Sequence, residues 1–261
     1  MQSHASEFLL IDVSNSFTKL ARSSAEQIVE VQQLATADVT VDALRHLIGE
    51  NHFDLCVLSS VVPAKNPEVE KFCSGTPLLV VGPGTDLGVR VDLPAPVRTG
   101  SDRLANVAFA AELGVLPVVV VDFGTAATFD VVTRDRAFVG GVIAPGLEAM
   151  TSYLHTRTAL LPRIDLREPS SPIGKTTEDA MRAGAIYGYR GLVRGILEEI
   201  KRNVSPRRDL EIIAAGGYAE WIGASLPEIR KIHPHLTLEG LRIIARRNVA
   251  GLAQGDRPSI S

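Results

Sequence analysis

“FLLIDVSNSFTKL” (residues 8–20) is an apolar strand that ends in Asp12 and continues with small polar residues, and it returns later in the chain as “VVVVDFGTAATFDVV” (118–132). In the two copies Asp12 matches Asp122, and Thr18 matches Thr128. An apolar strand, a turn of small residues and renewed extended character are typical of a β-hairpin. The repeat therefore predicts two domains of similar construction, 1–115 and 116–261, each with one acidic hairpin.

The rest of the chain alternates between strand-like and helix-like segments. Short apolar runs such as “LCVLSSVV” (55–62) and “EIIAAGG” (211–217) are typical of buried strands. Patterns such as “RLANVAFAAELG” (103–114) and “TEDAMRAGAIYGYRGLVRGILEEIKR” (177–202) predict helices. This alternation indicates an α/β fold with helices packed on the faces of its sheets.

Composition excludes several classes of protein. The 261 residues carry a formal net charge of −3, which gives no bulk attraction for nucleic acid or an acidic membrane. The two cysteines, Cys56 and Cys73, are too few for a disulfide framework and lack the spacing of a zinc site. The first residues do not have the pattern of a secretory signal, and no apolar run is long enough to span a bilayer. We therefore expect a cytoplasmic protein that binds neither nucleic acid nor membranes.

Both hairpins have the composition of a phosphate site. A tight turn of small residues leaves N–H groups and hydroxyls free to meet an anion, and the neighbouring aspartate can hold the accompanying cation. One such turn alone is more often structural, because Asp followed by Ser-Asn or Gly-Thr is ordinary turn chemistry. The recurrence of the same acid and the same threonine favours a binding role. Gly216 and Gly217, at a strand-helix corner, would let a flat ligand approach the backbone.

“RTGSDRLANVAFAA” (98–111) puts Asp102 and Arg103 at the start of a predicted helix. An aspartate in this position is commonly a helix cap. A kinase that acts on an alcohol needs a carboxylate to accept the hydroxyl proton and a guanidinium to hold a substrate anion. The two residues together are therefore candidates for a catalytic site.

Ten motifs, in order along nearly the whole chain, resemble those of the type III pantothenate kinases, which belong to the acetate and sugar kinase, Hsp70 and actin superfamily. The motifs are “DVSNS” (12–16), “SSVVP” (59–63), “GSDR” (100–103), “DFGTAATFD” (122–130), “GGVIAPG” (140–146), “TALLP” (158–162), “IGKTT” (173–177), “AGAIYGY” (183–189), “AAGGYA” (214–219) and “HPHLTLEGL” (233–241). The resemblance implies two similarly built actin-like (ribonuclease H-like) domains with a nucleotide cleft between them. It also implies ATP-dependent phosphorylation of pantothenate to 4'-phosphopantothenate, the first step of coenzyme A biosynthesis, by a homodimer that uses Mg²⁺ and either K⁺ or NH₄⁺.

The resemblance also assigns roles to single residues. Asp102 corresponds to the proton acceptor and Asp122 to the ligand of potassium. For Asp12 we expect, from its chemistry, that it holds magnesium, directly or through water. The residues that correspond to ATP contacts are Asp12, Val13, Ser14, Asn15, Ser16, Phe17, Thr18, Lys19, Thr125, Gly216 and Gly217. The residues that correspond to substrate contacts are Gly100, Ser101, Asp102, Arg103 and Thr177.

The chain departs from the family pattern at a few positions. Ser14 stands where the family usually has glycine, and Leu93 stands near the place of a substrate-binding tyrosine. If position 14 requires a positive φ, a side chain there costs about 1–2 kcal/mol. These departures leave two alternatives open: a non-catalytic regulator of the same fold, or a kinase or phosphohydrolase of the superfamily that acts on another small alcohol or phosphate.

Overall fold

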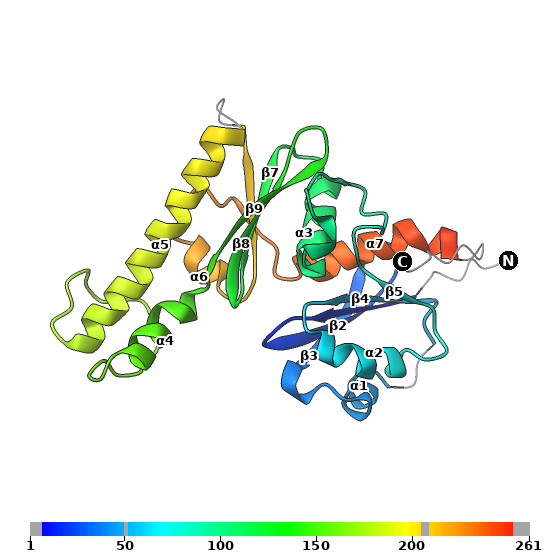
Figure 1. The fold of residues 1–261 in the computed structure, drawn as a ribbon, viewed down its shortest axis with the longest axis horizontal. Coiled ribbons are helices and arrows are strands. Elements are labelled where there is room, and N and C mark those ends of the chain that lie inside the picture. The colour runs from blue at the N-terminus through cyan, green and yellow to red at the C-terminus, as the bar shows by residue number, and fades with distance from the viewer. Residues whose placement is uncertain (1–6, 50–51, 205–208, 253–261) are drawn as a thin grey trace. The chain divides into compact units, whose positions relative to one another are not determined.

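The computed structural model describes residues 7–49, 52–204 and 209–252, which pack into two compact units (Figure 1). Unit 1 contains the described parts of 1–115, 134–139 and 235–261. Unit 2 contains those of 116–133 and 140–234.

Unit 1 is built on a five-stranded sheet with the order β3-β2-β1-β4-β5. Its strands are β1 (Phe8–Val13), β2 (Phe17–Ser23), β3 (Ile28–Ala35), β4 (Leu55–Ser60) and β5 (Leu78–Val80). The first three form an antiparallel meander, and β4 and β5 continue the sheet in parallel with β1. The central strand β1 is buried along its whole length. This explains why its sequence is a continuous apolar run rather than an alternating one.

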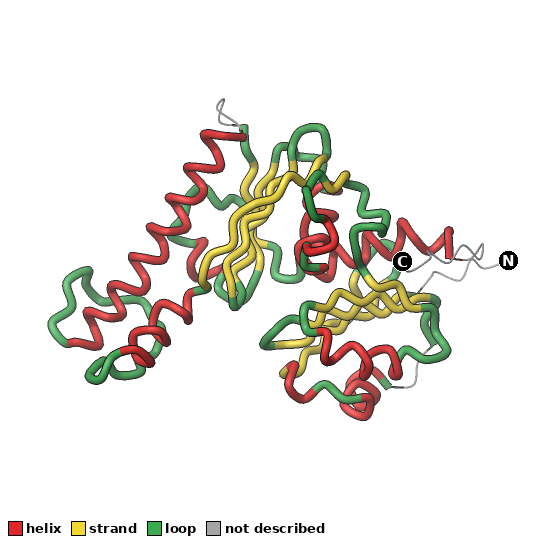
Figure 2. The backbone as a smooth tube through the Cα atoms, in the orientation of Figure 1, coloured by secondary structure: helices red, strands yellow, loops and turns green. Residues whose placement is uncertain are grey.

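Helices cover both faces of the sheet of unit 1 (Figure 2). On one face, side chains of α1 (Val41–Ile48) and α2 (Asn66–Phe72) share a core with Leu9, Ile11 and Val13 of β1. On the other, α3 (Ser101–Glu112) and α7 (Leu236–Leu252) pack together and against β4 and β1. The short elements are η1 (Thr36–Asp38), η2 (Pro63–Lys65), η3 (Pro96–Arg98) and β6 (Arg90–Val91), and β6 pairs with Ala137 and Phe138.

The second sheet has six strands in the order β11-β10-β7-β8-β9-β6, and its five strands other than β6 repeat the strand order of unit 1 as β9-β8-β7-β10-β11. The five strands of unit 2 are β7 (Val118–Phe123), β8 (Ala126–Val132), β9 (Ala137–Pro145, whose first three residues pack with unit 1), β10 (Glu211–Ala215) and β11 (Lys231–Ile232). As in unit 1, the first strand of a hairpin is central, with its antiparallel partner on one side and a parallel strand on the other. The prediction of an α/β fold built twice is confirmed.

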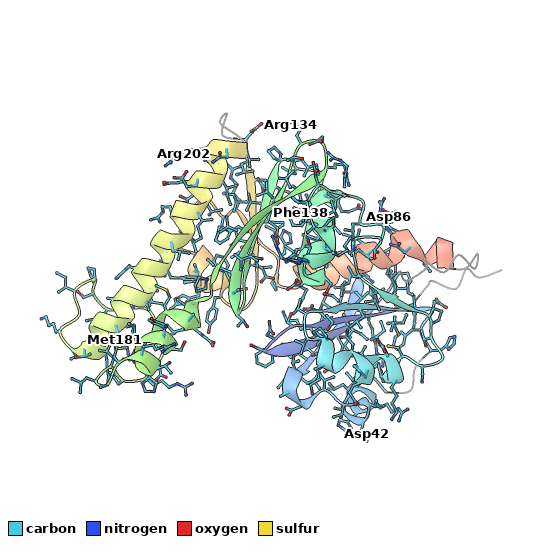
Figure 3. The ribbon with its side chains drawn as sticks, viewed as in Figure 1. Asp42, Asp86, Arg134, Phe138, Met181 and Arg202 are labelled. Atoms are coloured by element: carbon cyan, nitrogen blue, oxygen red, sulfur yellow. The ribbon has the colours of Figure 1, made fainter. Side chains whose placement is uncertain are left out.

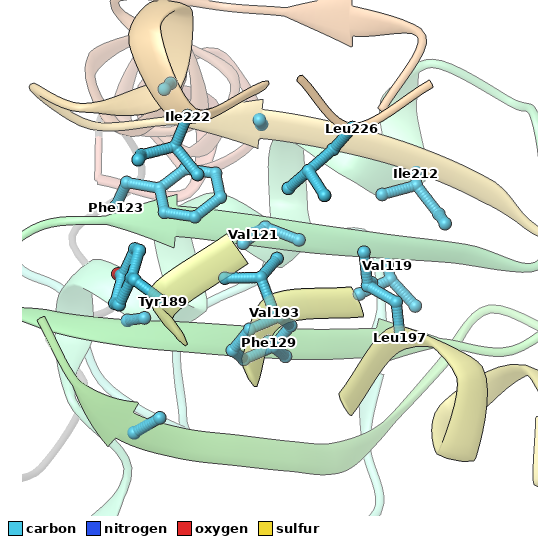
Figure 4. Close-up of a cluster of buried hydrophobic side chains, with 14 of the residues drawn as sticks. Val119, Val121, Phe123, Phe129, Tyr189, Val193, Leu197, Ile212, Ile222 and Leu226 are labelled. Carbon is cyan, nitrogen blue, oxygen red and sulfur yellow. The ribbon is translucent and has the colours of Figure 1, made fainter. Parts of the chain in front are cut away.

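The helices of unit 2 are α4 (Leu147–Arg157), α5 (Thr177–Val204) and α6 (Ala219–Gly223). Tyr189, Val193 and Leu197, each four residues apart on one side of α5, share a buried core with Val121 and Phe123 of β7 (Figure 4). None of the described helices is long and apolar enough to cross a membrane.

The predicted domain limits, 1–115 and 116–261, stay a prediction. The first change of unit falls at the predicted boundary, between Val115 and Leu116. The later helix α7, however, packs with α3 in unit 1, although it follows the strands of unit 2 in the chain.

We expect Leu197→Ala to lower the free energy of unfolding by about 2–5 kcal/mol, since the side chain is only 2% exposed and its removal leaves a cavity in the core of unit 2. Urea denaturation followed by circular dichroism measures the change. The neighbouring Glu198→Ala is the control, and should stay within about 0.5 kcal/mol because the Glu198–Arg202 ion pair is exposed. Equal effects of the two substitutions would contradict the described core.

Candidate functional site

In unit 1, strand pairing places Asp12 at the end of the sheet beside two polar residues. Asp12 is directly opposite Lys19 in the antiparallel ladder and beside Ser59 in the parallel ladder, so the three side chains emerge on the same face. The Asp12 carboxylate is only 4% exposed, and its Oδ2 accepts a hydrogen bond from the Ser14 hydroxyl at 3.1 Å. A carboxylate that is buried in this way is typical of a binding site, whereas the carboxylate of an ordinary surface turn is exposed to solvent.

The turn between β1 and β2 is held by Thr36. The Thr36 hydroxyl donates to the carbonyl oxygen of Ser14 at 2.7 Å, and the Thr36 N–H donates to that of Ser16 at 3.0 Å. Asn15 and Ser16 stay exposed. Arg136 is the sole non-glycine residue with a positive φ in the part of the chain that the structure describes, so Ser14 carries no left-handed strain. The departure from glycine at position 14 is therefore tolerated by the backbone.

Two of the predicted ATP contacts turn their side chains into the core. Val13 is fully buried among the side chains of α1 and α2, and Thr18 is fully buried with its hydroxyl 3.0 Å from that of Thr36. Phe17, by contrast, is 50% exposed. For Val13 and Thr18, the backbone is the part that a nucleotide could meet.

Ser101 ties the start of α3 to the end of β4. Its Oγ accepts a hydrogen bond from the N–H of Ser60 at 2.8 Å and lies 3.1 Å from the Oγ of Ser59. Asp12 lies beside Ser59 in the sheet, and Asp102 follows Ser101 in the helix. These contacts of Ser101 therefore bring the first hairpin and the “GSDR” segment to the same edge of unit 1.

The environment of Asp102 suits a proton acceptor. Burial raises the pKa of its carboxyl group above the ordinary value, although the Arg103 N–H, 2.7 Å from Oδ1, and the charge of Arg103 oppose that shift. Gly100 is needed beside it, because a Cβ at this position would lie 2.5 Å from Asp102 Oδ1. A side chain at position 100 would displace the carboxylate.

Arg103 is oriented by an aromatic ring. Its Cζ lies 5.5 Å from the centre of the Phe138 ring, at the start of β9 (Phe138 is labelled in Figure 3). A guanidinium above an aromatic face is attracted by the ring and loses freedom. This arrangement restrains the cation beside Asp102 without neutralising it.

In unit 2, Asp122 ends β7 beside the glycine pair. Gly216 has a φ of +93°, and a Cβ there would lie 2.6 Å from Asp122 Oδ1 and 2.5 Å from the carbonyl oxygen of Phe123. Only glycine can occupy this corner. Gly217, the next residue, is exposed and has open space around it.

The two hairpins differ in the length of their turns. In the first, the N–H of Ser14 donates to the carbonyl of Phe17, whereas in the second the N–H of Gly124 donates to that of Ala126, so the second turn encloses one residue fewer. Asp122 therefore pairs with Thr128, but Asp12 pairs with Lys19. The aspartates are equivalent in the two units and the matched threonines are not. Thr125, at the tip of the second turn, is exposed.

Tyr189 of α5 and Tyr218, which follows the glycine pair, are the tyrosines near Asp122. Burial, together with the negative charge of Asp122, raises the pKa of Tyr189 to about 12. Burial and a hydrogen bond to Glu148 Oε1, 2.6 Å away, raise the pKa of Tyr218 to about 12. Both phenols are therefore protonated at neutral pH. Tyr189 was not among the predicted site residues. The sequence does contain a hint of it, because Tyr189 is the polar member of the buried stripe that it forms with Val193 and Leu197 on α5.

Thr177 lies apart from the other predicted residues of unit 2. It is exposed in the first turn of α5, where the preceding Thr176 and Asp179 exchange hydrogen bonds of 2.9 and 3.1 Å. Tyr189 lies twelve positions further along α5, a rise of about 18 Å along the helix axis. Within unit 2 the structure thus brings together Asp122 and Gly216, whereas Thr177 lies apart at the start of α5.

A cavity of about 590 Å³ lies in unit 2 beside Tyr218, the residue that follows the glycine pair. Its lining includes Tyr218, Glu148, His155, Arg163 and Asp165. No group of three or more His, Cys, Asp or Glu side chains that could hold a metal ion occurs in residues 7–49, 52–204 and 209–252. A magnesium ion in a phosphate-binding site typically takes one or two carboxylates together with substrate phosphates, so a single buried carboxylate such as that of Asp12 is compatible with such a site.

Comparison with known sequences identifies similar proteins over most of the chain. The sequence profile of the type III pantothenate kinase family matches residues 8–199. A type III pantothenate kinase of Methylacidiphilum infernorum is 39% identical over 236 residues, which is 90% of this chain and 87% of that protein. One of Akkermansia muciniphila is 42% identical over 243 residues, which is 93% of this chain and 99% of that protein.

Comparison with solved structures bears on the fold alone, because the identities are low. A Campylobacter jejuni protein described as a Baf family transcriptional activator has a TM-score of 0.62 at 17% identity and covers 92% of this chain and 98% of its own. A Porphyromonas gingivalis protein described as an N-acetylglucosamine kinase has a TM-score of 0.50 at 12% identity, over 92% and 99% of the two chains. The predicted actin-like fold is confirmed.

We expect Gly216→Ala to destabilise unit 2 by at least about 2 kcal/mol, because it adds the strain of a positive φ to a clash with the carbonyl oxygen of Phe123. Urea denaturation measures the loss. Gly217→Ala is the matched control and should change the free energy of unfolding by less than about 1 kcal/mol, since nothing lies within 4 Å of its added Cβ. If both variants were equally stable, the described corner would be wrong.

Proposed function

This chain belongs to the type III pantothenate kinase family, and from that premise we infer that it transfers a phosphoryl group from ATP to pantothenate. The product is 4'-phosphopantothenate, and the reaction is the first step of coenzyme A biosynthesis. The family and the enzyme class predicted from the motifs, a phosphotransferase with an alcohol acceptor, are confirmed. The observation that carries the mechanism is the hydrogen bond of Ser101 to the end of β4, because it joins Asp102 to the edge where Asp12 lies.

We propose that Asp102 accepts the proton of the substrate hydroxyl during an in-line transfer. A raised pKa brings a carboxylate closer to the working pH and makes it a better base while it remains deprotonated at neutral pH. Arg103, restrained by Phe138, would bind the carboxylate of pantothenate through two parallel hydrogen bonds. Gly100 and Ser101 would contribute backbone contacts to the same substrate, since the Ser101 hydroxyl is engaged with β4.

Each unit contains some of the residues that we propose as ATP contacts. In unit 1 these are the turn from Asp12 to Lys19, whose Asn15 and Ser16 are exposed. In unit 2 they are Thr125, exposed at the second turn, and the pair Gly216 and Gly217. These roles are supported by exposure and by the close approach of backbone at Gly216.

The cations proposed here would be held by the two hairpin aspartates. Asp12 would hold Mg²⁺, directly or through water, and Asp122 would hold K⁺ or NH₄⁺. When bound, these ions neutralise the charge of the phosphates during transfer. Asp122 is a candidate for this role because it ends β7 beside the glycine corner, where the backbone comes close to its carboxylate.

A homodimer in the cytoplasm completes the proposal. Exposed apolar side chains occur on α4, on α5 and in the segment between them: Tyr153, Leu160, Ile173 and Tyr187. We propose that they form part of the dimer interface, since a contiguous exposed apolar patch marks an interaction surface. Thr177, at the start of α5, would contact the substrate from this part of the molecule. The buried Cys56 and Cys73 are free thiols, as a reducing cytoplasm requires.

We expect ADP release that depends on added pantothenate, and Asp102→Asn should lower its rate at least about 100-fold, because the variant has no base for the hydroxyl proton. In the wild type the rate should fall as the pH drops through the raised pKa of Asp102, and this acid limb should be absent from the residual rate of the variant. A coupled assay measures both. A regulator would release no ADP, and a phosphohydrolase would release phosphate without pantothenate.

Stability provides the control for Asp102→Asn. The folded pKa lies above the unfolded one, so the folded state binds more protons between the two values and is less stable above them. The variant should therefore be more stable than the wild type at pH 7, and the difference should vanish below the unfolded pKa of about 3.9. If the variant were less stable than the wild type at pH 7, its loss of activity would be explained by partial unfolding and not by the loss of the proposed base.

We expect Leu160→Asp to convert a dimer into a monomer, since the side chain is 90% exposed in the proposed interface and a buried charge there is costly. Sedimentation equilibrium measures the molecular mass. Val97→Asp, at a residue that is 83% exposed in unit 1, is the control and should leave the mass unchanged. A wild type that sediments as a monomer of 28.0 kDa would exclude the dimer.

A further inference from the structure

The start of α4 lies directly against the turn of the second hairpin. The N–H of Gly146, which precedes α4, donates a hydrogen bond to the carbonyl oxygen of Thr125 at 3.2 Å. A Cβ at position 146 would lie 2.4 Å from that oxygen and 2.5 Å from the carbonyl oxygen of Gly124. Leu147, the first residue of α4, is fully buried in the core of unit 2. The turn that carries Thr125 therefore rests on the start of α4.

A hydrogen bond ties the first turn of α4 to the glycine corner. The hydroxyl of Tyr218, the residue after Gly217, donates to Glu148 Oε1 at 2.6 Å. This length is typical of an O–H group that donates to a charged carboxylate, a bond stronger than one between neutral groups. The N–H of Tyr218 also donates to the carbonyl oxygen of Phe123 at 3.4 Å. Tyr218 thus joins the end of β7, the glycine pair and α4.

Together these contacts form a closed ring in unit 2. From Phe123 the chain passes into the second turn, the turn contacts the start of α4, and the Glu148–Tyr218 bond returns from α4 to Phe123. The core gives α4 little further support, since Leu147 and Thr151 are the buried residues among its eleven. Loss of the Glu148–Tyr218 bond would therefore let the start of α4, and with it the second turn, shift relative to the glycine corner.

We propose that Glu148 and Tyr218 are positioning residues for ATP, because their hydrogen bond fixes the distance between Thr125 and the glycine pair, the two places where the nucleotide would contact unit 2. This inference rests on the ATP contacts proposed above. A ligand that bridges two contacts binds best when their separation is set in advance, since neither contact then has to be ordered on binding. The bond therefore matters for ATP and not for pantothenate, whose proposed contacts are residues 100–103 and Thr177.

The experiment compares KM for ATP with KM for pantothenate, measured on the full chain with Mg²⁺ and K⁺. Tyr218→Phe removes the hydroxyl and keeps the ring, Glu148→Ala removes the acceptor, and the double variant removes both. Glu148→Gln keeps a neutral acceptor. Glu220→Ala is the matched control, because Glu220 is likewise an exposed acid in the first turn of a helix, α6, and so has the same relation to the helix dipole as Glu148 in α4.

We expect Tyr218→Phe and Glu148→Ala each to raise KM for ATP about tenfold, while kcat and KM for pantothenate stay within about twofold of the wild type. The double variant should equal the single variants, because all three lose the same bond. Glu148→Gln should lie between these variants and the wild type, and Glu220→Ala should match the wild type.

Three other results would overturn the inference. An unchanged KM for ATP in Tyr218→Phe and Glu148→Ala would exclude the positioning role and leave the proposed kinase reaction intact. A parallel rise of both KM values would show that the bond supports unit 2 in general, and effects that add in the double variant would show that the two residues act separately. A wild type without pantothenate-dependent turnover of ATP would remove the proposed function itself.

A second measurement covers a variant that folds less well. Should Tyr218→Phe melt at a lower temperature than the wild type, Glu148→Ala is used instead, since the side chain of Glu148 is exposed. A non-hydrolysable ATP analogue with Mg²⁺ is titrated by calorimetry well below the melting temperature. An affinity about tenfold weaker than that of Glu220→Ala supports the positioning role. An equal affinity overturns it.

Discussion

The structure depends on the cost of placing a carboxylate at the end of a buried strand. Asp12 is 4% exposed, and such a charge is kept only where positive groups and hydrogen-bond donors surround it. The pairing of β1 with β2 and β4 provides Lys19, Ser14 and Ser59 around it. Ser59 in turn contacts Ser101, so the helix that carries the proposed base is anchored to the same strand end. In unit 1 the contacts that hold the fold together are therefore also the contacts that position the candidate site residues.

Much of this arrangement is predictable from the sequence, because it depends on local pattern. The apolar runs that end in Asp12 and Asp122 predict two central strands, and their recurrence predicts the repeated strand order. Asp102 at a helix start is equally visible. Family membership, which the motifs indicate, adds the reaction. Each of these features is encoded within about fifteen neighbouring residues, where spacing alone carries the information.

The features that escaped prediction depend on tertiary partners. The one-residue difference between the two turns places Thr18 opposite Val13 but Thr128 opposite Asp122, and only the ladder reveals it. Tyr189 is an ordinary member of an apolar stripe in the sequence, and its unpartnered hydroxyl becomes visible only when α5 packs on β7. Likewise, no local pattern indicates that Thr36 holds the first turn. Because a shift of one residue moves a side chain to the other face of a strand, such details carry functional weight.

The return of α7 to unit 1 has a consequence for synthesis on the ribosome. The strands of unit 1 emerge first, yet α7, one of the two helices that pack on the same face of its sheet, is translated only after the whole of unit 2. Until then an apolar surface of the nascent chain lacks its cover, and surfaces of this kind recruit chaperones or aggregate. Unit 2, whose described strands and helices are contiguous apart from residues 134–139, can mature earlier. The half of the protein that is made first is therefore the half that is finished last.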